Sequence, residues 1–321
     1  MNRKVLFGVA ASGATAATVL GLREQRRRAI ANLRPPGVMR EIDGEQIHYL
    51  DEGTGPPIVL IHGFAGSAWS WRSTIPALVS AHRTVALDLP GFGYSDRHPA
   101  HPLSHEQHAH RVVRLMDSLG IESATVIGHS MGGAIAARVA VSWPARVDRL
   151  VLVASVDAGE AADWRDAMDR FSFILRLADV GLAIPPLTRA ISRAGVRSIV
   201  ANRAYITEDV VRGYCDPFVM PGTGACLRKL VADTVNEPPI DLSRISAPTL
   251  VISGDVDPSI PPATGERIAA KIPGARHVVV AGAGHLVPEE QPDAFLAELR
   301  GFLAQTSGAA AAPVSRDGSA Q

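Results

Sequence analysis

The residues of this chain that are best suited to covalent chemistry lie in the segment Gly128-His129-Ser130-Met131-Gly132. A serine with glycine two positions before it and two positions after it is typical of a tight turn from a strand into a helix. An apolar run precedes this serine at 124–127, and a run of small residues follows it at 132–140. In such a turn the backbone of the serine is strained and its hydroxyl lies at the amino end of the helix, where negative charge is favoured. Ser130 is therefore a candidate nucleophile, provided that the surrounding elements support the turn.

The chain around Ser130 alternates short apolar runs with helical segments. Two short runs, at 39–43 and 46–51, predict a hairpin that turns at Asp43-Gly44. Ser104 and Gln107 form a capping box that predicts the start of a helix ending near Leu119. The remaining runs predict strands at 57–61, 84–87, 124–127, 149–154, 248–253 and 277–280, and helices at 69–80, 132–140, 264–271 and 292–303. This alternation predicts an α/β fold with a doubly wound, mostly parallel sheet.

The alternation is interrupted between residues 156 and 239. This stretch has helical apolar segments with interspersed arginines, and no strand-like run that ends in a turn. We expect it to form a helical cap on a core made of residues 39–155 and 240–305. Residues 306–321 contain little that can be buried and are expected to be a disordered tail.

The overall composition excludes some classes of partner. The chain of 321 residues is 46% hydrophobic, and its 32 basic side chains balance 32 acidic ones. The sequence has no basic face with interleaved aromatic residues, so nothing in it indicates a nucleic-acid partner.

Cys215 and Cys226 are the only cysteines. They could pair in an exported protein, but two cysteines do not make a disulfide framework, and whether they pair stays open.

The amino-terminal segment, 1–30, is expected to be an apolar leader or a membrane anchor. Its uncharged stretch at 5–22 lies between two basic clusters and just reaches the length of a membrane span. Three interpretations remain open: an uncleaved anchor, a signal peptide cleaved near Ala14-Thr15-Ala16, or an amphipathic leader on a cytosolic enzyme. We expect membrane association through residues 5–22, and otherwise a cytoplasmic or exported protein. We also expect residues 1–30 to be dispensable for activity.

From about Met39 to Gln305 the sequence resembles the α/β-hydrolase fold family. The resemblance lies in His62-Gly63-Phe64, the loop Asp88-Leu89-Pro90-Gly91-Phe92-Gly93, the turn at Ser130, Gly254-Asp255-Val256-Asp257, and Gly284-His285. These motifs occur in the family's order, with serine first, aspartate second and histidine last. The resemblance implies a serine-nucleophile hydrolase of the esterase or lipase type with a helical cap.

That resemblance implies a catalytic triad of Ser130, Asp257 and His285. A serine hydroxyl needs an adjacent base, and His285 follows the last strand, from where it can reach Ser130. Asp257 is favoured as the acid over Asp255, which is expected to cap its loop, and over Asp157, whose position some relatives use. The oxyanion hole would consist of the backbone N–H groups of Phe64 and Met131. No cofactor and no metal ion are implied.

The histidines between positions 98 and 110 suggest only loosely a metal site. These histidines are His98, His101, His105, His108 and His110. Because no tight ligand set accompanies them, they are interpreted as the solvated start of a helix. His129 is expected to point away from the site and to be structural.

Several functions remain compatible with these residues. The expected one is hydrolysis of a small-molecule ester with a small to medium apolar acyl or alcohol part, because the cap segment carries more apolar residues than a solvated loop needs. The alternatives are a carbon–carbon bond hydrolase, a cofactor-free perhydrolase or haloperoxidase-like enzyme, and a non-catalytic binding protein of the same fold. Substrate-binding residues, the natural substrate and the oligomeric state stay open.

Overall fold

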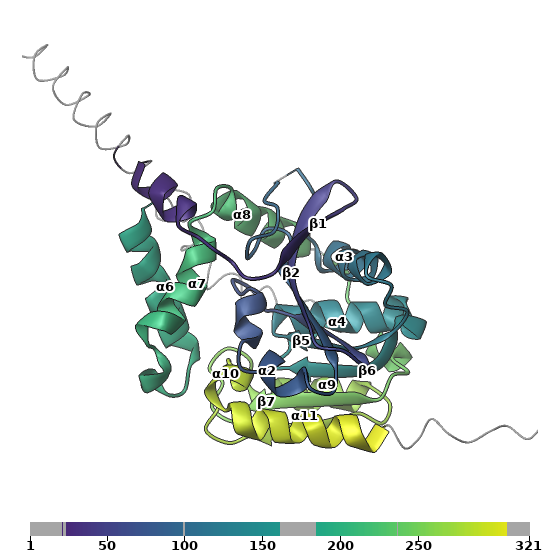
Figure 1. The fold of residues 1–321 in the computed structure, drawn as a ribbon. Helices are drawn as coiled ribbons and strands as arrows, with labels where there is room; N and C mark the ends of the chain where they lie inside the picture. The colour runs from purple at the N-terminus through teal and green to yellow at the C-terminus, as the bar shows by residue number, and fades with distance from the viewer. Residues whose placement is uncertain (1–20, 22–23, 99, 161–183, 236, 307–321) are drawn as a thin grey trace, which may run out of the picture.

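An eight-stranded sheet with the strand order β1-β2-β4-β3-β5-β6-β7-β8 forms the centre of the molecule (Figure 1). The computed structural model describes residue 21 and residues 24–98, 100–160, 184–235 and 237–306. β1 and β2 pair antiparallel, β2 also runs antiparallel to β4, and all pairs from β4 to β8 are parallel. The strands are β1 (Val38–Ile42), β2 (Glu45–Glu52), β3 (Pro57–Ile61), β4 (Arg83–Leu87), β5 (Ala124–His129), β6 (Val147–Val153), β7 (Thr249–Gly254) and β8 (Arg276–Val280).

Helices cover both faces of this sheet, which confirms the doubly wound arrangement. Alternate residues of a strand point to opposite faces. In β3, Val59 and Ile61 join the apolar core under α3 (His105–Ser118), α4 (Met131–Ser142) and α9 (Pro262–Lys271). Ile58 and Leu60 join the core on the other face, under η1 (Ala68–Trp71), α2 (Ile75–Leu78) and α11 (Pro292–Thr306). Because both faces are buried, the central strands are continuous apolar runs.

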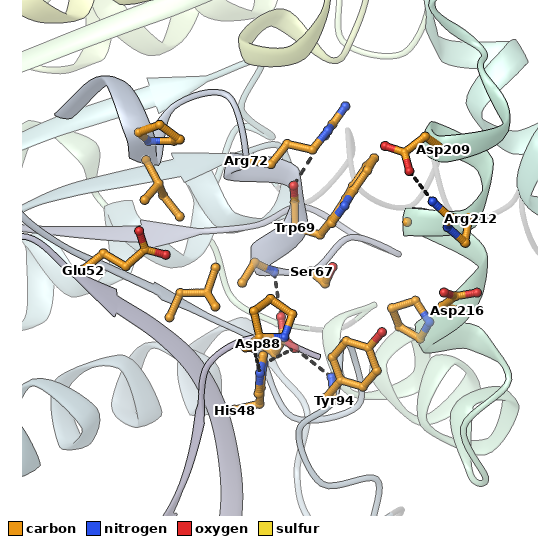
Figure 2. A pocket seen from close by; sticks show the side chains of 17 residues that line it. His48, Glu52, Ser67, Trp69, Arg72, Asp88, Tyr94, Asp209, Arg212 and Asp216 are labelled. Atoms are coloured by element: carbon orange, nitrogen blue, oxygen red, sulfur yellow. Dashed lines mark hydrogen bonds and ion pairs between the residues drawn. The ribbon is translucent and has the colours of Figure 1, made fainter. Parts of the chain in front are cut away.

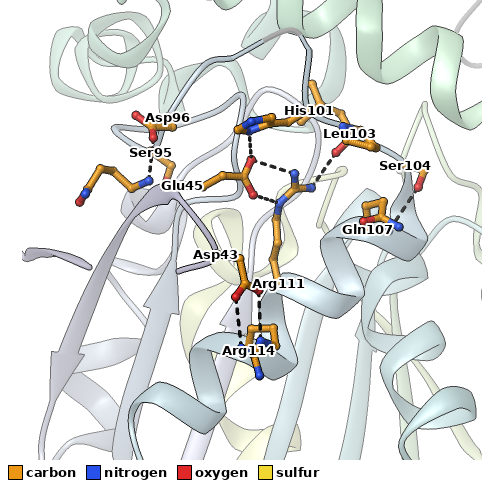
Figure 3. Close-up of polar contacts among 12 residues, drawn as sticks. Asp43, Glu45, Ser95, Asp96, His101, Leu103, Ser104, Gln107, Arg111 and Arg114 are labelled. Carbon is orange, nitrogen blue, oxygen red and sulfur yellow. Dashed lines mark hydrogen bonds and ion pairs between the residues drawn. The ribbon is translucent and has the colours of Figure 1, made fainter. Parts of the chain in front are cut away.

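The hairpin β1–β2 forms at the predicted position and is fastened to α3 (Figure 3). Asp43, at its turn, has a positive φ of 52°. Glu45 is buried and accepts two hydrogen bonds from Arg111 of α3, at 2.6 and 2.8 Å, and one from His101 at 2.8 Å. The predicted cap of α3 is confirmed, since the Ser104 side chain accepts a hydrogen bond from the Gln107 N–H at 3.2 Å.

The single helix predicted at 69–80 is wrong. Two short pieces, η1 and α2, occupy this stretch, and Thr74 precedes α2. Pro76 lies at the second position of α2. Proline has no N–H to donate to an earlier turn, so it fits the start of a new helix better than the middle of an existing one.

Helices also fill the described part of the connection between β6 and β7. They are α6 (Pro185–Ile199), η3 (Arg203–Tyr205), α7 (Glu208–Phe218) and α8 (Thr223–Thr234). Residues 161–183, with several of the apolar side chains on which the substrate expectation rests, lie outside the described residues. Three further short helices lie outside the cap: η2 (Pro144–Arg146), η4 (Leu242–Arg244) and α10 (Val287–Glu290).

The described end of the amino-terminal segment contacts the cap. Residues 24–31 are helical, and the Arg26 guanidinium donates to the carbonyl oxygens of Val219 and Met220, at 2.7 and 2.9 Å, just after α7. The end of the expected leader therefore has a partner in the fold, whereas the dispensability of residues 1–30 for activity stays a prediction. No helix among the described residues is long and apolar enough to span a membrane. The stretch 5–22 falls almost wholly outside the described residues, as does the predicted tail from residue 307 onwards.

Candidate active site

The turn between β5 and α4 holds Ser130 in a strained conformation. Its φ is +53° and its ψ is −119°, although it is not glycine. The flanking glycines are required by space: a Cβ at Gly128 would lie 2.1 Å from the Gly132 oxygen, and a Cβ at Gly132 would lie 2.4 Å from the Ile61 oxygen. The Ser130 N–H donates to the Val153 oxygen of β6 at 2.9 Å, which fixes the turn to the sheet. Strain of this kind persists only where the surroundings impose it.

The structure brings Ser130, His285 and Asp257 into one hydrogen-bonded chain. The His285 Nε2 lies 3.0 Å from the Ser130 Oγ, and its Nδ1 lies 2.7 Å from the Asp257 Oδ2. The other carboxylate oxygen of Asp257 accepts the N–H groups of Ser259 and Ile260, at 2.7 and 2.9 Å. All three members of the chain are buried. The three residues that the sequence motifs singled out thus meet although they are far apart in the chain.

The two competing carboxylates are engaged elsewhere. Asp157 pairs with the Lys271 Nζ at 2.8 Å and accepts the Gly159 N–H at 2.9 Å. Asp255 accepts the Ala283 N–H at 3.2 Å and so caps its loop, as the sequence suggested. Lys271, which holds Asp157 in place, is a residue that the sequence analysis missed.

The loop after β3 lies against the serine. A Cβ at Gly63 would be 2.9 Å from the His129 Nδ1 and 3.0 Å from the Ser130 Cβ, so a larger residue here would press against the serine turn. Phe64 follows in the same loop, and its ring meets the Phe92 ring edge to face at 5.9 Å. Met131 is the first residue of α4, where a backbone N–H has no carbonyl of an earlier turn to bond. The two predicted oxyanion residues therefore belong to two different segments, the loop after β3 and the start of α4.

His129 does not point away from the site, so that part of the expectation is wrong, whereas its contacts agree with the expected structural role. Its ring lies 4.9 Å from the ring of His285, and its Nε2 is 2.8 Å from the carbonyl oxygen of His285. A carbonyl can only accept, so His129 donates from Nε2. Burial, together with the neighbouring His285, lowers the pKa of His129 to about 3, so its ring stays neutral. His129 thus supports the backbone of His285.

Asp88 organises the loops beside the site. Its carboxylate accepts the N–H groups of Ala68 and Tyr94, at 2.6 and 2.7 Å, and the Nδ1–H of His48 at 2.7 Å (Figure 2). Burial alone would raise the pKa of Asp88, but the hydrogen bond and charge of His48, together with His62 and the Ala68 N–H, outweigh it, and the pKa is lowered. The motif that begins at Asp88 therefore shapes the scaffold and supplies no reacting group.

The histidines between 98 and 110 are not a uniformly solvated helix start. His105 and His108 are buried in α3. His105 pairs with Glu237 at 2.9 Å and His101 pairs with Glu45. Among the described residues, no group of three or more His, Cys, Asp or Glu side chains is arranged to hold a metal ion. Cys215 and Cys226 are both buried free thiols.

A cavity of about 390 Å³ lies between the core and α7, and no triad residue lines it. Figure 2 shows Trp69 and Arg72 on the core side of this cavity and Asp209, Arg212 and Asp216 on the cap side. Its charges are mixed, so it does not select one ligand chemistry. The geometry of the triad, not this cavity, marks the candidate active site.

Contacts that no sequence pattern predicted hold the cap beside His285. The His285 N–H donates to the Ile199 oxygen at the end of α6, at 2.8 Å. Glu289 and Glu290, in the helix that follows His285, both accept hydrogen bonds from cap residues. No sequence pattern around Glu289 and Glu290 predicts that their partners lie in the cap.

Comparisons with known proteins agree with this geometry. Residues 56–177 match the family described as alpha/beta hydrolase fold, and residues 216–311 match one described as TAP-like protein. The 2-hydroxymuconate semialdehyde hydrolase of Pseudomonas sp. (strain CF600) is 30% identical over 287 residues, which covers 86% of this chain and 97% of that protein.

Two solved structures extend the comparison. Est816, described as an N-acyl homoserine lactone degrading enzyme, is 26% identical with a TM-score of 0.67, covering 83% of this chain and 100% of its own. A thermophilic esterase from Thermogutta terrifontis, at 24% identity, has a TM-score of 0.73 and covers 84% of this chain and 99% of its own, which is a likeness of fold. The matched families and the 30% identity to a full-length hydrolase place this chain in the α/β-hydrolase fold family.

Proposed function

We propose that this protein is a serine hydrolase that cleaves carboxylic esters through an acyl-enzyme intermediate. The observation that carries the proposal is the hydrogen-bonded chain from Ser130 through His285 to Asp257, with Ser130 held at a positive φ at the start of α4. Nucleophile, base and orienting acid are the parts that acyl transfer needs.

In the proposed mechanism, His285 takes the hydroxyl proton at Nε2 as the Ser130 Oγ attacks the ester carbonyl. Asp257 keeps the His285 proton on Nδ1 and stabilises the imidazolium that forms. The N–H groups of Phe64 and Met131 bind the oxyanion. His285 then gives its proton to the leaving alcohol, and a water molecule activated by the same histidine hydrolyses the acyl-enzyme.

The substrate is proposed to have an apolar acyl or alcohol part of small to medium size. Support comes from the side chains next to the triad: Met131 and Leu286 are buried, and Phe64 packs against the apolar core. Each methylene buried in an apolar pocket contributes about 0.8 kcal/mol. The ratio kcat/KM on nitrophenyl esters should therefore rise from acetate to about butyrate or hexanoate and then fall. A strict preference for acetate would contradict the proposed apolar part of the substrate.

Ser130→Ala tests the chemistry itself. Alanine fits the turn, so the protein should fold, while turnover of the best ester should fall by about a million-fold. Labelling by a fluorophosphonate should disappear in the same variant. Retention of more than about a tenth of the wild-type rate would remove Ser130 from the mechanism, and a wild-type protein that resists the fluorophosphonate would favour a non-catalytic binder.

Carbon–carbon bond hydrolysis is a second candidate, favoured by the 30% identity to a 2-hydroxymuconate semialdehyde hydrolase. The same triad serves both reactions. Assay of the purified protein with vinylogous diketone acids beside the ester series separates them. Cleavage of the diketone acids alone would replace the ester proposal.

Association with a membrane through residues 5–22 is a further proposal, supported by the sequence of that stretch. Deletion of residues 1–22 keeps Arg26 at its contact after α7. The shortened protein should move from the membrane fraction to the soluble fraction with its kcat/KM unchanged. A full-length protein found wholly in the soluble fraction and unprocessed would defeat the anchor.

A further inference from the structure

Glu289 lies one helical turn beyond the candidate base His285 and is almost completely buried, with 3% of its side chain exposed. Its Oε2 accepts a hydrogen bond from Arg72 at 2.5 Å and another from the Tyr205 hydroxyl. Its Oε1 accepts the Tyr214 hydroxyl at 2.5 Å. A buried carboxylate is costly unless it is paired and hydrogen-bonded, and here both oxygens are used.

The donors to Glu289 come from two parts of the molecule. Tyr205 belongs to η3 and Tyr214 to α7, both in the cap, whereas Arg72 follows η1 in the core. Arg72 also donates to the Tyr205 hydroxyl at 2.7 Å and lies 3.5 Å above the Trp69 ring. Burial, reinforced by the Glu289 carboxylate, raises the pKa of both tyrosines, so both hydroxyls remain donors at neutral pH.

Close packing surrounds these polar contacts. Leu286, the residue after His285, shares an apolar cluster with Val196, Val200 and Val210 of the cap. A Cβ at Gly213 of α7 would lie 2.3 Å from the Trp69 ring, so α7 approaches the core as closely as glycine permits. The backbone of the same loop is fixed as well, because the His285 N–H donates to Ile199 and Glu290 accepts the Ala201 N–H at 2.6 Å.

We propose that Glu289 is a positioning residue that fastens η3 and α7 of the cap to the loop of His285 and thereby sets the affinity for the acyl part of the substrate. This proposal rests on the ester hydrolysis proposed above. Glu289 acts through Tyr205 and Tyr214 and touches no reacting atom. Hydrogen bonds to a charged, buried group are among the strong ones, so their loss should free this part of the cap.

The test compares Glu289→Gln and the double variant Tyr205→Phe/Tyr214→Phe with the wild-type protein. The double variant removes the cap's donors without changing the helix next to His285. Glu298→Gln is the control. Glu298 lies in α11 and forms an exposed ion pair with Arg276 of β8, outside the active site. In both test variants KM for nitrophenyl hexanoate should rise about tenfold. KM for the acetate and kcat per active site, counted by fluorophosphonate titration, should stay within about twofold, since the chemistry is unchanged.

A merely structural role for Glu289 would give a different result. The fraction of active sites would fall with the melting temperature, while KM for hexanoate kept its wild-type value in the sites that remain. That outcome, or a rise in KM equal to that of Glu298→Gln, would overturn the proposal.

A measurement without substrate separates this proposal from the ester hypothesis. Hydrogen exchange of the α7 backbone amides should be faster in Glu289→Gln and in the double variant than in the wild type, and unchanged in Glu298→Gln. Faster exchange in a protein that cleaves no ester would keep the cap fastening and reject ester hydrolysis. Unchanged exchange in both test variants would reject the fastening, whatever the substrate.

Discussion

At the scale of single residues, the neighbourhood of each carboxylate decides its role. Asp257 faces the His285 Nδ1, while Asp157 is neutralised by Lys271. Asp257→Asn should lower kcat by about ten-thousand-fold, because an amide no longer holds the reactive tautomer or stabilises the imidazolium. Steady-state kinetics on the best ester measure this loss.

Asp157→Asn is the matched substitution for that experiment. It should leave kcat within several-fold of wild type and lower the stability modestly, because the Lys271 ammonium loses one of its two carboxylate partners and keeps the other, Glu160. If Asp157→Asn abolished turnover in a folded protein and Asp257→Asn did not, the assignment of the acid would be reversed.

At the scale of elements, two arginines of α3 bind the β1–β2 hairpin in different surroundings (Figure 3). Arg111 and Glu45 are buried, with 10% and 9% of their side chains exposed, whereas Arg114 and Asp43 are exposed. Arg111→Met should lower the free energy of unfolding by about 3–5 kcal/mol, because it leaves the Glu45 carboxylate buried without its main partner.

Arg114→Met removes the same kind of contact at the surface. The solvent already screens that pair, so the variant should unfold close to the wild-type urea midpoint. Urea unfolding followed by circular dichroism measures both variants. Equal losses in the two would show that burial of the Arg111 pair does not matter for the hairpin.

For the whole molecule, buried histidines should make the fold sensitive to acid. Burial lowers the pKa of His62, His108 and His129, the last to about 3. Below the ordinary histidine pKa of about 6.5, these histidines are protonated in the unfolded chain but stay neutral in the folded protein. The free energy of unfolding therefore falls as the pH drops.

Other groups act in the opposite direction or at lower pH. Burial alone would lower the pKa of His48, but the hydrogen bond and charge of Asp88 and the Pro36 carbonyl together raise it, so its contribution is complete below about pH 6.5 and fades at higher pH. The pKa of Asp88 is lowered, so its contribution is lost only as the pH falls below the ordinary carboxyl range. Between about pH 6.5 and 4 the three buried histidines should therefore dominate.

His108→Leu tests this account. Within the described residues neither ring nitrogen of His108 has a hydrogen-bond partner, so an apolar side chain of similar volume fits the site. The free energy of unfolding of the variant should fall less steeply between pH 6.5 and 4.5 than that of the wild type. Identical slopes in urea titrations across this range would exclude His108 as a source of the acid sensitivity.

The sequence by itself determined the sheet and the serine turn, because both follow from local rules. Strand positions follow from apolar runs, and the turn follows from the clash that any Cβ at Gly128 or Gly132 would cause. The same local rules failed at 69–80, where Pro76 starts a second helix.

Only the tertiary structure decided which residues surround the serine. Asp157 and Asp257 both follow strands, and their roles diverge because Lys271 reaches one and His285 the other. The partners of Glu289 come from residues 72, 205 and 214. Contacts over such separations leave no periodic signal in the chain, since they depend on how the cap packs on the core and not on local conformation.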